Sequence, residues 1–266
     1  MSDSQSQNHS EHRWGFRFLT TLLLGGQVLL RLCKGRIHRR NLLEHMVTVG
    51  PGSLSPVLLS IGAAGMIFTL QTARELTHYG AVDAVGGAFA VAFCRELAPV
   101  LTAGVVAGQV GCAYAAELGA MQVTEQIDAL YMLKTDPIDY LVVPRVVACC
   151  LMLPVITILA LVVGLAGGVF VAAKFYSLAP DVFLNSVRTF LVPWDLLSVV
   201  IKAFVFGAII SIIGCGWGMT TTGGVKGVGQ SATAAVVTAW VSIFLIDFFL
   251  SLVLFEGLGV TLINGV

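Results

Sequence analysis

Residues 141–173 read LVVPRVVACCLMLPVITILALVVGLAGGVFVAA, and this stretch decides the class of fold. It contains a single charged residue, Arg145. About 20 apolar residues in a helix cross the hydrocarbon core of a bilayer, so this stretch can span a membrane with tilt or a kink. Pro144 and Pro154 supply kink sites. We therefore expect an integral membrane protein built of helices.

The composition of the 266-residue chain supports this class. Hydrophobic residues make up 57% and charged residues 11%, against about 45–50% and about 25% in average soluble domains. Fifteen basic residues balance fifteen acidic ones, so the net charge is zero. A soluble enzyme is excluded because so little charge cannot cover a water-facing surface. Binding to nucleic acid is not expected, because the chain has no basic field.

Five stretches are long and apolar enough to span a bilayer. They are residues 54–76, 85–107, 141–173, 196–217 and 234–255. The second continues as a helix towards Glu117. The fold class expected is all-α, with these five helices forming a domain over residues 51–266.

An earlier apolar stretch, residues 14–33, is ambiguous. It holds Arg17 and Arg31 near its ends and Gly25-Gly26 in its middle. It can cross as a sixth helix, or lie in the interface with its arginines reaching the headgroups. Residues 14–50 then form an interfacial helix and a basic segment. The polar residues 1–13 are expected to be disordered and lack the features of a secretory signal.

The basic residues predict the orientation. Seven of the fifteen precede the first clear span, and their cluster at 31–40 places the N-terminus in the cytoplasm. The loops at 122–139 and 219–233 are then cytoplasmic, whereas 77–84 and 174–195 lie outside. The expected location is the inner (plasma) membrane of a bacterial cell. A plastid inner envelope is the less favoured setting, because no transit peptide is visible.

The first cytoplasmic loop predicts a short amphipathic helix at about residues 123–133. Thr124 is its expected N-cap, and Asp136-Pro137 its expected stop. Such a helix suits docking into a groove of a soluble partner, although a plain connector fits the spacing equally. The residues named for docking are Val123, Glu125, Gln126, Ile127, Asp128 and Leu130.

The second cytoplasmic loop nearly matches a phosphate-binding pattern. Gly224 and Gly229 have the right spacing, but Gln230 replaces the required lysine and no strand precedes the loop. We therefore expect no nucleotide site in this loop. We also expect no cofactor or metal site and no catalytic residue in this chain. If ATP drives the protein, another chain binds it.

A few ionisable residues lie within or at the ends of the spans, where charge is expensive unless paired or hydrated. Lys202 and Asp247 lie at similar depth and can pair. Arg95 and Glu96 are adjacent, so on a helix they point about 100° apart and cannot both face one partner. They can line a polar cavity or hold the bundle together. The candidates for a lipid cavity are Arg95, Glu96, Glu75 and Pro99.

The motifs resemble one family. RELAPVLTA at 95–103, AELGAMQVTEQIDAL at 116–130 and DPIDYLVVPR at 136–145 are similar to the MlaE/YrbE permeases, the membrane subunits of MCE-type ABC lipid transporters, which include chloroplast TGD-type relatives. The loop at 223–231 also looks like that family's last cytoplasmic loop. Gln109 departs from the basic residue expected there.

The resemblance implies an N-terminal interfacial helix plus five transmembrane helices, working as a homodimer. The segment at 123–133 resembles the coupling helix that docks on a cytoplasmic ABC ATPase, which binds ATP and Mg²⁺. The substrate would be phospholipid or a related lipid, exchanged with a periplasmic MCE-domain substrate-binding protein. The lipid's identity and the direction of transport stay open.

Two other classes compete with this interpretation. A stand-alone secondary transporter or channel would use the charges within the spans, but no internal inverted repeat is visible. An intramembrane lipid-modifying enzyme would need histidines clustered with acids in the spans. The five histidines of this chain all lie outside the spans or at their ends.

Overall fold

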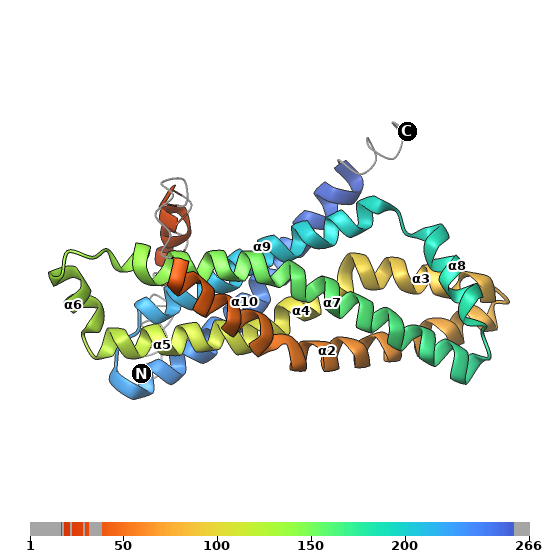
Figure 1. The fold of residues 1–266 in the computed structure, drawn as a ribbon, viewed down its shortest axis with the longest axis horizontal. Coiled ribbons are helices and arrows are strands. Elements are labelled where there is room, and N and C mark those ends of the chain that lie inside the picture. Colours follow the sequence, from red (N-terminus) through yellow and green to blue (C-terminus); the bar gives the residue numbers. More distant parts are fainter. Residues whose placement is uncertain (1–16, 18, 22, 29, 32–38, 258–266) are drawn as a thin grey trace, which may run out of the picture. The chain divides into compact units, whose positions relative to one another are not determined.

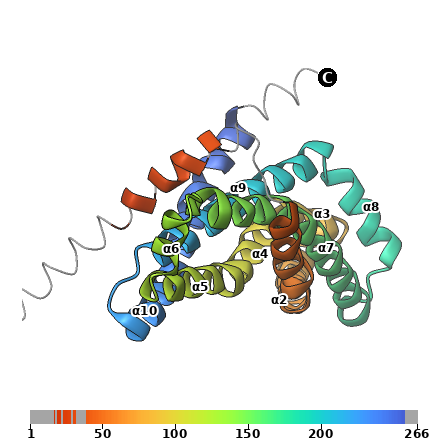
Figure 2. The same cartoon turned by 60° about the vertical axis from the view of Figure 1, so that its left-hand side comes forward.

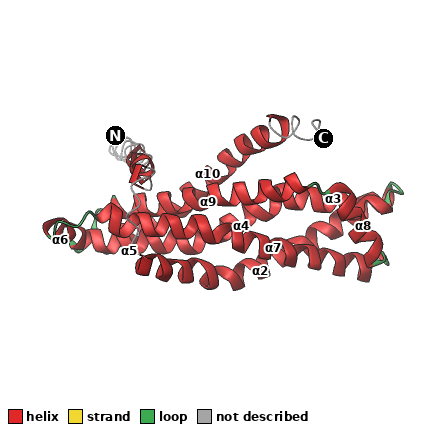
Figure 3. Ribbon diagram, turned by 45° about the horizontal axis from the view of Figure 1, so that its top comes forward, coloured by secondary structure: helices red, strands yellow, loops and turns green. Residues whose placement is uncertain are grey.

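The computed structural model describes residues 17, 19–21, 23–28, 30–31 and 39–257. These residues are helical almost throughout, and none of them forms a β-strand (Figure 3). Within this described part, five helices are long and apolar enough to cross a membrane. The prediction of an all-α integral membrane protein is confirmed. The stretch 1–13, predicted to be disordered, lies outside the described residues.

The five spanning helices contain the predicted spans and extend beyond most of them. The first is α2 (Arg39–His78), and the fourth is α9 (Pro193–Met219). The third is η4 (Ile138–Val142) with α7 (Val143–Tyr176), and the fifth is α10 (Gly224–Ser251) with η5 (Leu252–Gly257). The second span joins η1 (Val82–Ala84), α3 (Val85–Ala92), η2 (Phe93–Leu97), α4 (Ala98–Val106), η3 (Ala107–Gly111) and α5 (Cys112–Val123).

The chain divides into two compact units. Unit 1 comprises residues 1–49, 106–149 and 207–242, and unit 2 comprises 50–105, 150–206 and 243–266. Both loops expected in the cytoplasm belong to unit 1. The predicted charged residues of the spans all belong to unit 2.

Unit 2 contains a helix that the sequence analysis did not predict. Pro180 opens α8 (Pro180–Phe190), which covers α3, and the two helices lie side by side in Figures 1 and 2. The ring of Phe183 packs 5.9 Å from that of Phe89, and the Gly87 N–H donates to Ser186 Oγ at 3.0 Å. We expected only an outside connection here, because so short a helix carries no spanning signal.

Glycine allows close packing between α2 and α7 in unit 2. A Cβ on Gly65 would lie 2.4 Å from the Gly164 carbonyl oxygen, and one on Gly164 would lie 2.3 Å from the Phe93 ring. Such distances are too short for any larger residue. Small residues bring helices together in lipid in this way.

In unit 1 the described part of residues 17–31 is helical and packs on α9. Thr21 lies against Gly216, and Gly25 lies against Ile212. Its opposite face exposes Leu19, Leu23 and Leu30. Whether the helix lies in the interface or spans the membrane stays a prediction.

Two arginines fasten this N-terminal helix within unit 1. Arg17 donates to the Trp217 carbonyl at 2.9 Å and to Ser231 Oγ at 2.8 Å. Arg31 pairs with Asp136 at 2.6 Å and with Asp139 at 2.9 Å. The helix is thereby tied to both loops that we expect in the cytoplasm.

The predicted cytoplasmic helix is shorter than expected. α6 runs Gln126–Met132, and Val123 ends α5 instead. The N-cap prediction was wrong, because Thr124 Oγ1 donates back to the Ala120 carbonyl while Glu125 occupies the cap position at φ 60°. The prediction that Asp136-Pro137 ends this helix was also wrong, since α6 already ends at Met132. Asp136 instead accepts a hydrogen bond from the Ile138 N–H.

Candidate functional site

A π-helical turn carries the first charged pair of the spans. In η2 the Ala98 N–H donates to the Phe93 carbonyl, five residues back. Pro99 has no N–H, so it cannot bond the Arg95 carbonyl as residue i+4 does in a regular α-helix. Single π turns inside α-helices are frequent at functional sites. Pro99 therefore leaves the Arg95 carbonyl without its α-helical donor.

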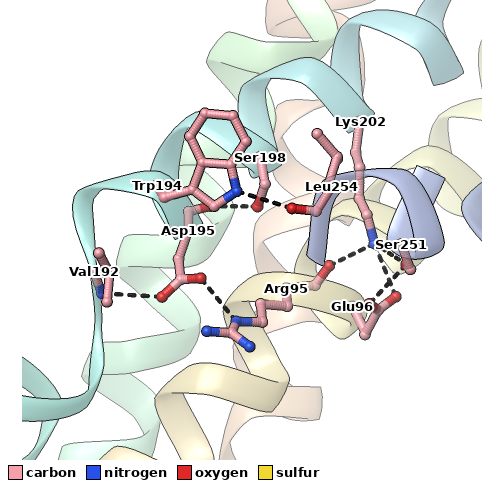
Figure 4. Close-up of polar contacts among 9 residues, drawn as sticks. All are labelled: Arg95, Glu96, Val192, Trp194, Asp195, Ser198, Lys202, Ser251 and Leu254. Carbon is pink, nitrogen blue, oxygen red and sulfur yellow. Dashed lines mark hydrogen bonds and ion pairs between the residues drawn. The ribbon is translucent and has the colours of Figure 1, made fainter. Parts of the chain in front are cut away.

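Lys202 of α9 supplies a donor to that carbonyl and gathers acidic groups around itself (Figure 4). Its Nζ donates to the Arg95 carbonyl at 2.8 Å and to Glu96 Oε2 at 2.9 Å. It also donates to Ser251 Oγ at 2.8 Å, and Asp247 Oδ1 lies 2.8 Å away. Ser251 in turn donates to Glu96 Oε1 at 2.9 Å. The Lys202 side chain has no exposed surface, so these oxygens take the place of water around the ammonium. The structure thus contains the expected Lys202–Asp247 pair.

Arg95 turns to a different partner, as expected for a residue next to Glu96. Its Nε donates to Asp195 Oδ1 at 2.8 Å, and Asp195 Oδ2 accepts the Val192 N–H at 3.0 Å. The ring of Phe255 lies 4.7 Å from the Arg95 guanidinium carbon. Asp195 was missed because it falls at the edge of a predicted outside loop. Its position in the first turn of α9 was the available signal, since acids favour helix N-termini.

We call these groups the unit 2 ionic cluster: Arg95, Glu96, Asp195, Lys202, Asp247 and Ser251. The cluster is buried on one side and open on the other. Asp195 and Lys202 have side chains 1% and 0% exposed, whereas those of Arg95 and Glu96 are 30% and 44% exposed. Its accessible edge therefore presents one positive and one negative group.

Glu75 lies apart from this cluster. It lines a cavity of about 430 Å³ at the end of α2, together with Arg74, Thr77, His78 and Tyr176. Among the described residues, no hydrogen bond or ion pair joins Glu75 to Glu96. Pro99 is buried and acts on the cluster through the backbone, as described above.

The sequence also matches known proteins. Residues 42–253 match the family described as Permease MlaE. The chain belongs to the MlaE permease family. A probable ABC transporter permease protein of Synechocystis sp. is 55% identical to this MlaE-family chain, over 98% of the chain and 99% of that relative. The Arabidopsis thaliana protein TRIGALACTOSYLDIACYLGLYCEROL 1, chloroplastic, is 49% identical, over 97% of the chain and 73% of the relative. A probable ABC transporter permease protein of Pyropia yezoensis is 44% identical, over 93% and 94%.

The predicted docking residues of this MlaE-family permease lie in or next to α6, which follows α5 after a tight turn (Figure 1). Glu125, Gln126 and Asp128 are exposed, Leu130 is half-buried, and Ile127 is buried at 2% exposure. Ile127 therefore holds the helix in place and is not itself available to a partner.

The most exposed apolar residues at α6 were not among the predictions. Tyr131, Met132 and Leu133 are 55%, 86% and 73% exposed. We call these three residues the α6 tip. The available sequence signal was the apolar run Tyr131-Met132-Leu133 at the end of the predicted helix.

Proposed function

We propose that this chain is the permease subunit of an ABC transporter that moves phospholipid or a related lipid. It would exchange the lipid between the membrane and a periplasmic MCE-domain protein, driven by ATP hydrolysis in a separate cytoplasmic subunit. The family assignment supports the permease role. The name of the Arabidopsis relative contains that of a glycolipid, which supports a lipid substrate.

The observation that carries the proposal is the free end of the Arg95 guanidinium. Only its Nε bonds Asp195, and neither terminal nitrogen donates to another residue in the described part of the chain (Figure 4). The planar guanidinium fork matches a phosphate in a bidentate geometry. Glu96 beside it can receive the ammonium of a zwitterionic headgroup. The open edge of the unit 2 ionic cluster thus fits a phospholipid headgroup.

A homodimer is proposed from the fifth span. In the most apolar part of Gly224–Phe255 only 11% of residues are buried, against 61% for the second span. Large apolar residues line its exposed surface, including Val241, Leu245, Phe248 and Phe249. A second copy of the chain would cover part of this surface and enclose the lipid between the two copies.

The α6 tip is the proposed docking site for the ATPase, which would bind ATP and Mg²⁺. Exposed apolar residues at a helix end suit insertion into a groove. The acidic groups of Glu125 and Asp128 beside the tip would meet basic residues of the partner. The proposed setting is an inner (plasma) membrane with a cytoplasmic N-terminus, or a plastid inner envelope as the Arabidopsis relative suggests.

Co-purification tests the assembly. The tagged chain is co-expressed with a candidate ABC ATPase and an MCE-domain protein, and capture of each is measured. Glu125→Lys and Asp128→Lys should reduce ATPase capture at least tenfold. Asp83→Lys, an equally exposed acid in a loop expected on the opposite side, is the matched control. Unchanged capture and unchanged lipid transport in both variants would refute the coupling role.

Photo-crosslinking to a phospholipid tests the headgroup site. Glu96→Arg should reduce crosslinking, because it removes the carboxylate that meets the ammonium and that Lys202 requires. Lipid transport that continues without any ATPase would favour a secondary transporter instead.

A further inference from the structure

The charges of the unit 2 ionic cluster do not balance. Arg95 pairs with Asp195, whose second oxygen accepts a backbone N–H, so this pair is neutral and both Asp195 oxygens accept a hydrogen bond. Lys202 then faces two carboxyl groups, those of Glu96 and Asp247. In the described part of the chain, Lys202 is the ion-pair partner of both acids, and no second cation pairs with either of them. With every acid ionised, the cluster would hold one uncompensated negative charge.

The hydrogen bonds of the cluster also lack one donor. An ammonium group has three N–H donors, and those of Lys202 go to the Arg95 carbonyl, Glu96 and Ser251. The Ser251 hydroxyl donates its own proton in a hydrogen bond to Glu96 Oε1. Asp247 Oδ1 lies 2.8 Å from Lys202 Nζ as an ion pair but accepts no hydrogen bond of regular geometry from any described residue, although Asp247 is only 9% exposed. A buried acceptor left without a donor destabilises the folded state.

Lys202 Nζ lies 2.9 Å from Glu96 Oε2 and 2.8 Å from Asp247 Oδ1, so these two carboxylate oxygens are less than 6 Å apart. Two carboxylates this close share a proton because both cannot remain ionised. One bound proton would remove the excess charge and supply the donor that Asp247 lacks.

We propose that Glu96 and Asp247 together bind one proton, which makes the unit 2 ionic cluster neutral. The proton comes from a hydronium ion of the bulk solvent: one O–H bond of the hydronium breaks, an O–H bond forms on one carboxylate, and a water molecule is left. Lys202 Nζ continues to donate to the Arg95 carbonyl, which Pro99 leaves without its α-helical donor.

The proton site acquires a role in transport if the proposed function holds. Glu96 is the exposed acid of the pair, so an anionic headgroup on Arg95 would place negative charge near the shared proton. A like charge within several ångströms strengthens proton binding by about tenfold or more. The cluster would then take up a proton from solvent when an anionic lipid binds, and it would release that proton when the lipid leaves.

Infrared difference spectroscopy over a pH titration tests the site directly. The full chain is placed in nanodiscs of phosphatidylcholine, and the C=O stretch of a protonated carboxyl is followed. We expect this band near neutral pH, where ordinary exposed carboxyls are ionised, with loss of about one protonated carboxyl as pH rises further. Asp247→Asn and Glu96→Gln should each abolish it, because Lys202 then balances the one acid that remains. Glu75→Gln, which removes an exposed carboxyl of the same unit, should retain it.

Several results would overturn the proton site. These are the absence of the band at every pH at which the chain is folded, or its persistence in both single variants. Stoichiometric binding of Na⁺ without a protonated carboxyl would also overturn it.

The link to lipid is tested by replacing phosphatidylcholine with anionic phosphatidylglycerol. The midpoint of the band should rise by about one pH unit. Arg95→Lys keeps the positive charge but loses the planar guanidinium, so the midpoint of the band should rise less in this variant. An equal rise in this variant would reflect surface potential alone and refute the link. None of these measurements needs the ATPase, so failed ATPase capture with an intact band would refute the proposed function and leave the proton site standing.

Discussion

Replacing Lys202 with methionine removes the ammonium that holds the unit 2 ionic cluster together. Methionine keeps most of the apolar stem but deletes three hydrogen bonds and the positive charge. Loss of one partner from a buried ion pair usually destabilises by about 3–5 kcal/mol. The Glu96 side chain is 44% exposed, so solvent screening reduces its share. We therefore expect Lys202→Met to lower the free energy of unfolding by about 3 kcal/mol.

The assay is reversible unfolding by sodium dodecyl sulfate in mixed micelles, followed by tryptophan fluorescence. Lys174→Met is the matched control, because Lys174 is exposed at the end of α7, and it should change stability by less than about 0.5 kcal/mol. Lys202→Met combined with Asp247→Leu should recover at least about 1 kcal/mol, since it removes the stranded carboxylate. A loss below about 1 kcal/mol in Lys202→Met, or no recovery in the double variant, would refute the reasoning.

Three further predictions follow from packing and from unit 1. Gly65→Ala should lower the free energy of unfolding by about 1–3 kcal/mol in the same assay, because its Cβ would lie 2.4 Å from a backbone oxygen. The control Gly229→Ala should be tolerated, because a Cβ there meets nothing within 4 Å. Equal effects of the two substitutions would contradict this prediction. Met132→Asp should abolish ATPase capture without changing stability, and Tyr79→Asp, at 78% exposure on a loop expected outside, should not affect capture. Arg31→Ala should lower the free energy of unfolding by about 1 kcal/mol or less. It should also speed amide hydrogen exchange in residues 126–139. Unchanged exchange would show that the two ion pairs of Arg31 do not hold that loop.

The spans were predictable because each is an uninterrupted apolar stretch with very few charges. Their ends were less predictable, since helices continue past the apolar region wherever the backbone still finds partners. The second span shows this, because η2 and η3 keep Val82–Val123 helical through two π turns. The bounds of α6 were missed because Glu125 takes a left-handed conformation that side chains rarely adopt.

The ionic cluster was predictable only in part. Lys202 and Asp247 stood out because charges are rare within spans and these two lie at similar depth. Their link to Glu96 depends on how helices distant in sequence pack, which spacing along one helix does not show. Ser251 gave no signal, because serine is common in membrane helices. Asp195 was lost at a loop boundary that was set by hydropathy alone.

Pro99 explains why the unit 2 ionic cluster forms at this place in the helix bundle. Lipid tails are as apolar as leucine, so helices in a membrane gain little by burying apolar side chains against each other. Polar contacts and close small-residue packing must hold them instead, and every freed backbone group needs a partner. By leaving the Arg95 carbonyl without its regular donor, Pro99 provides an acceptor that Lys202 can satisfy from another helix. Once Lys202 is buried there, it requires nearby carboxylates, and Glu96 is the next residue along the same π turn. A single break in the backbone bonding of the second span therefore accounts for both the anchoring of Lys202 to that span and the polar edge proposed to meet the lipid.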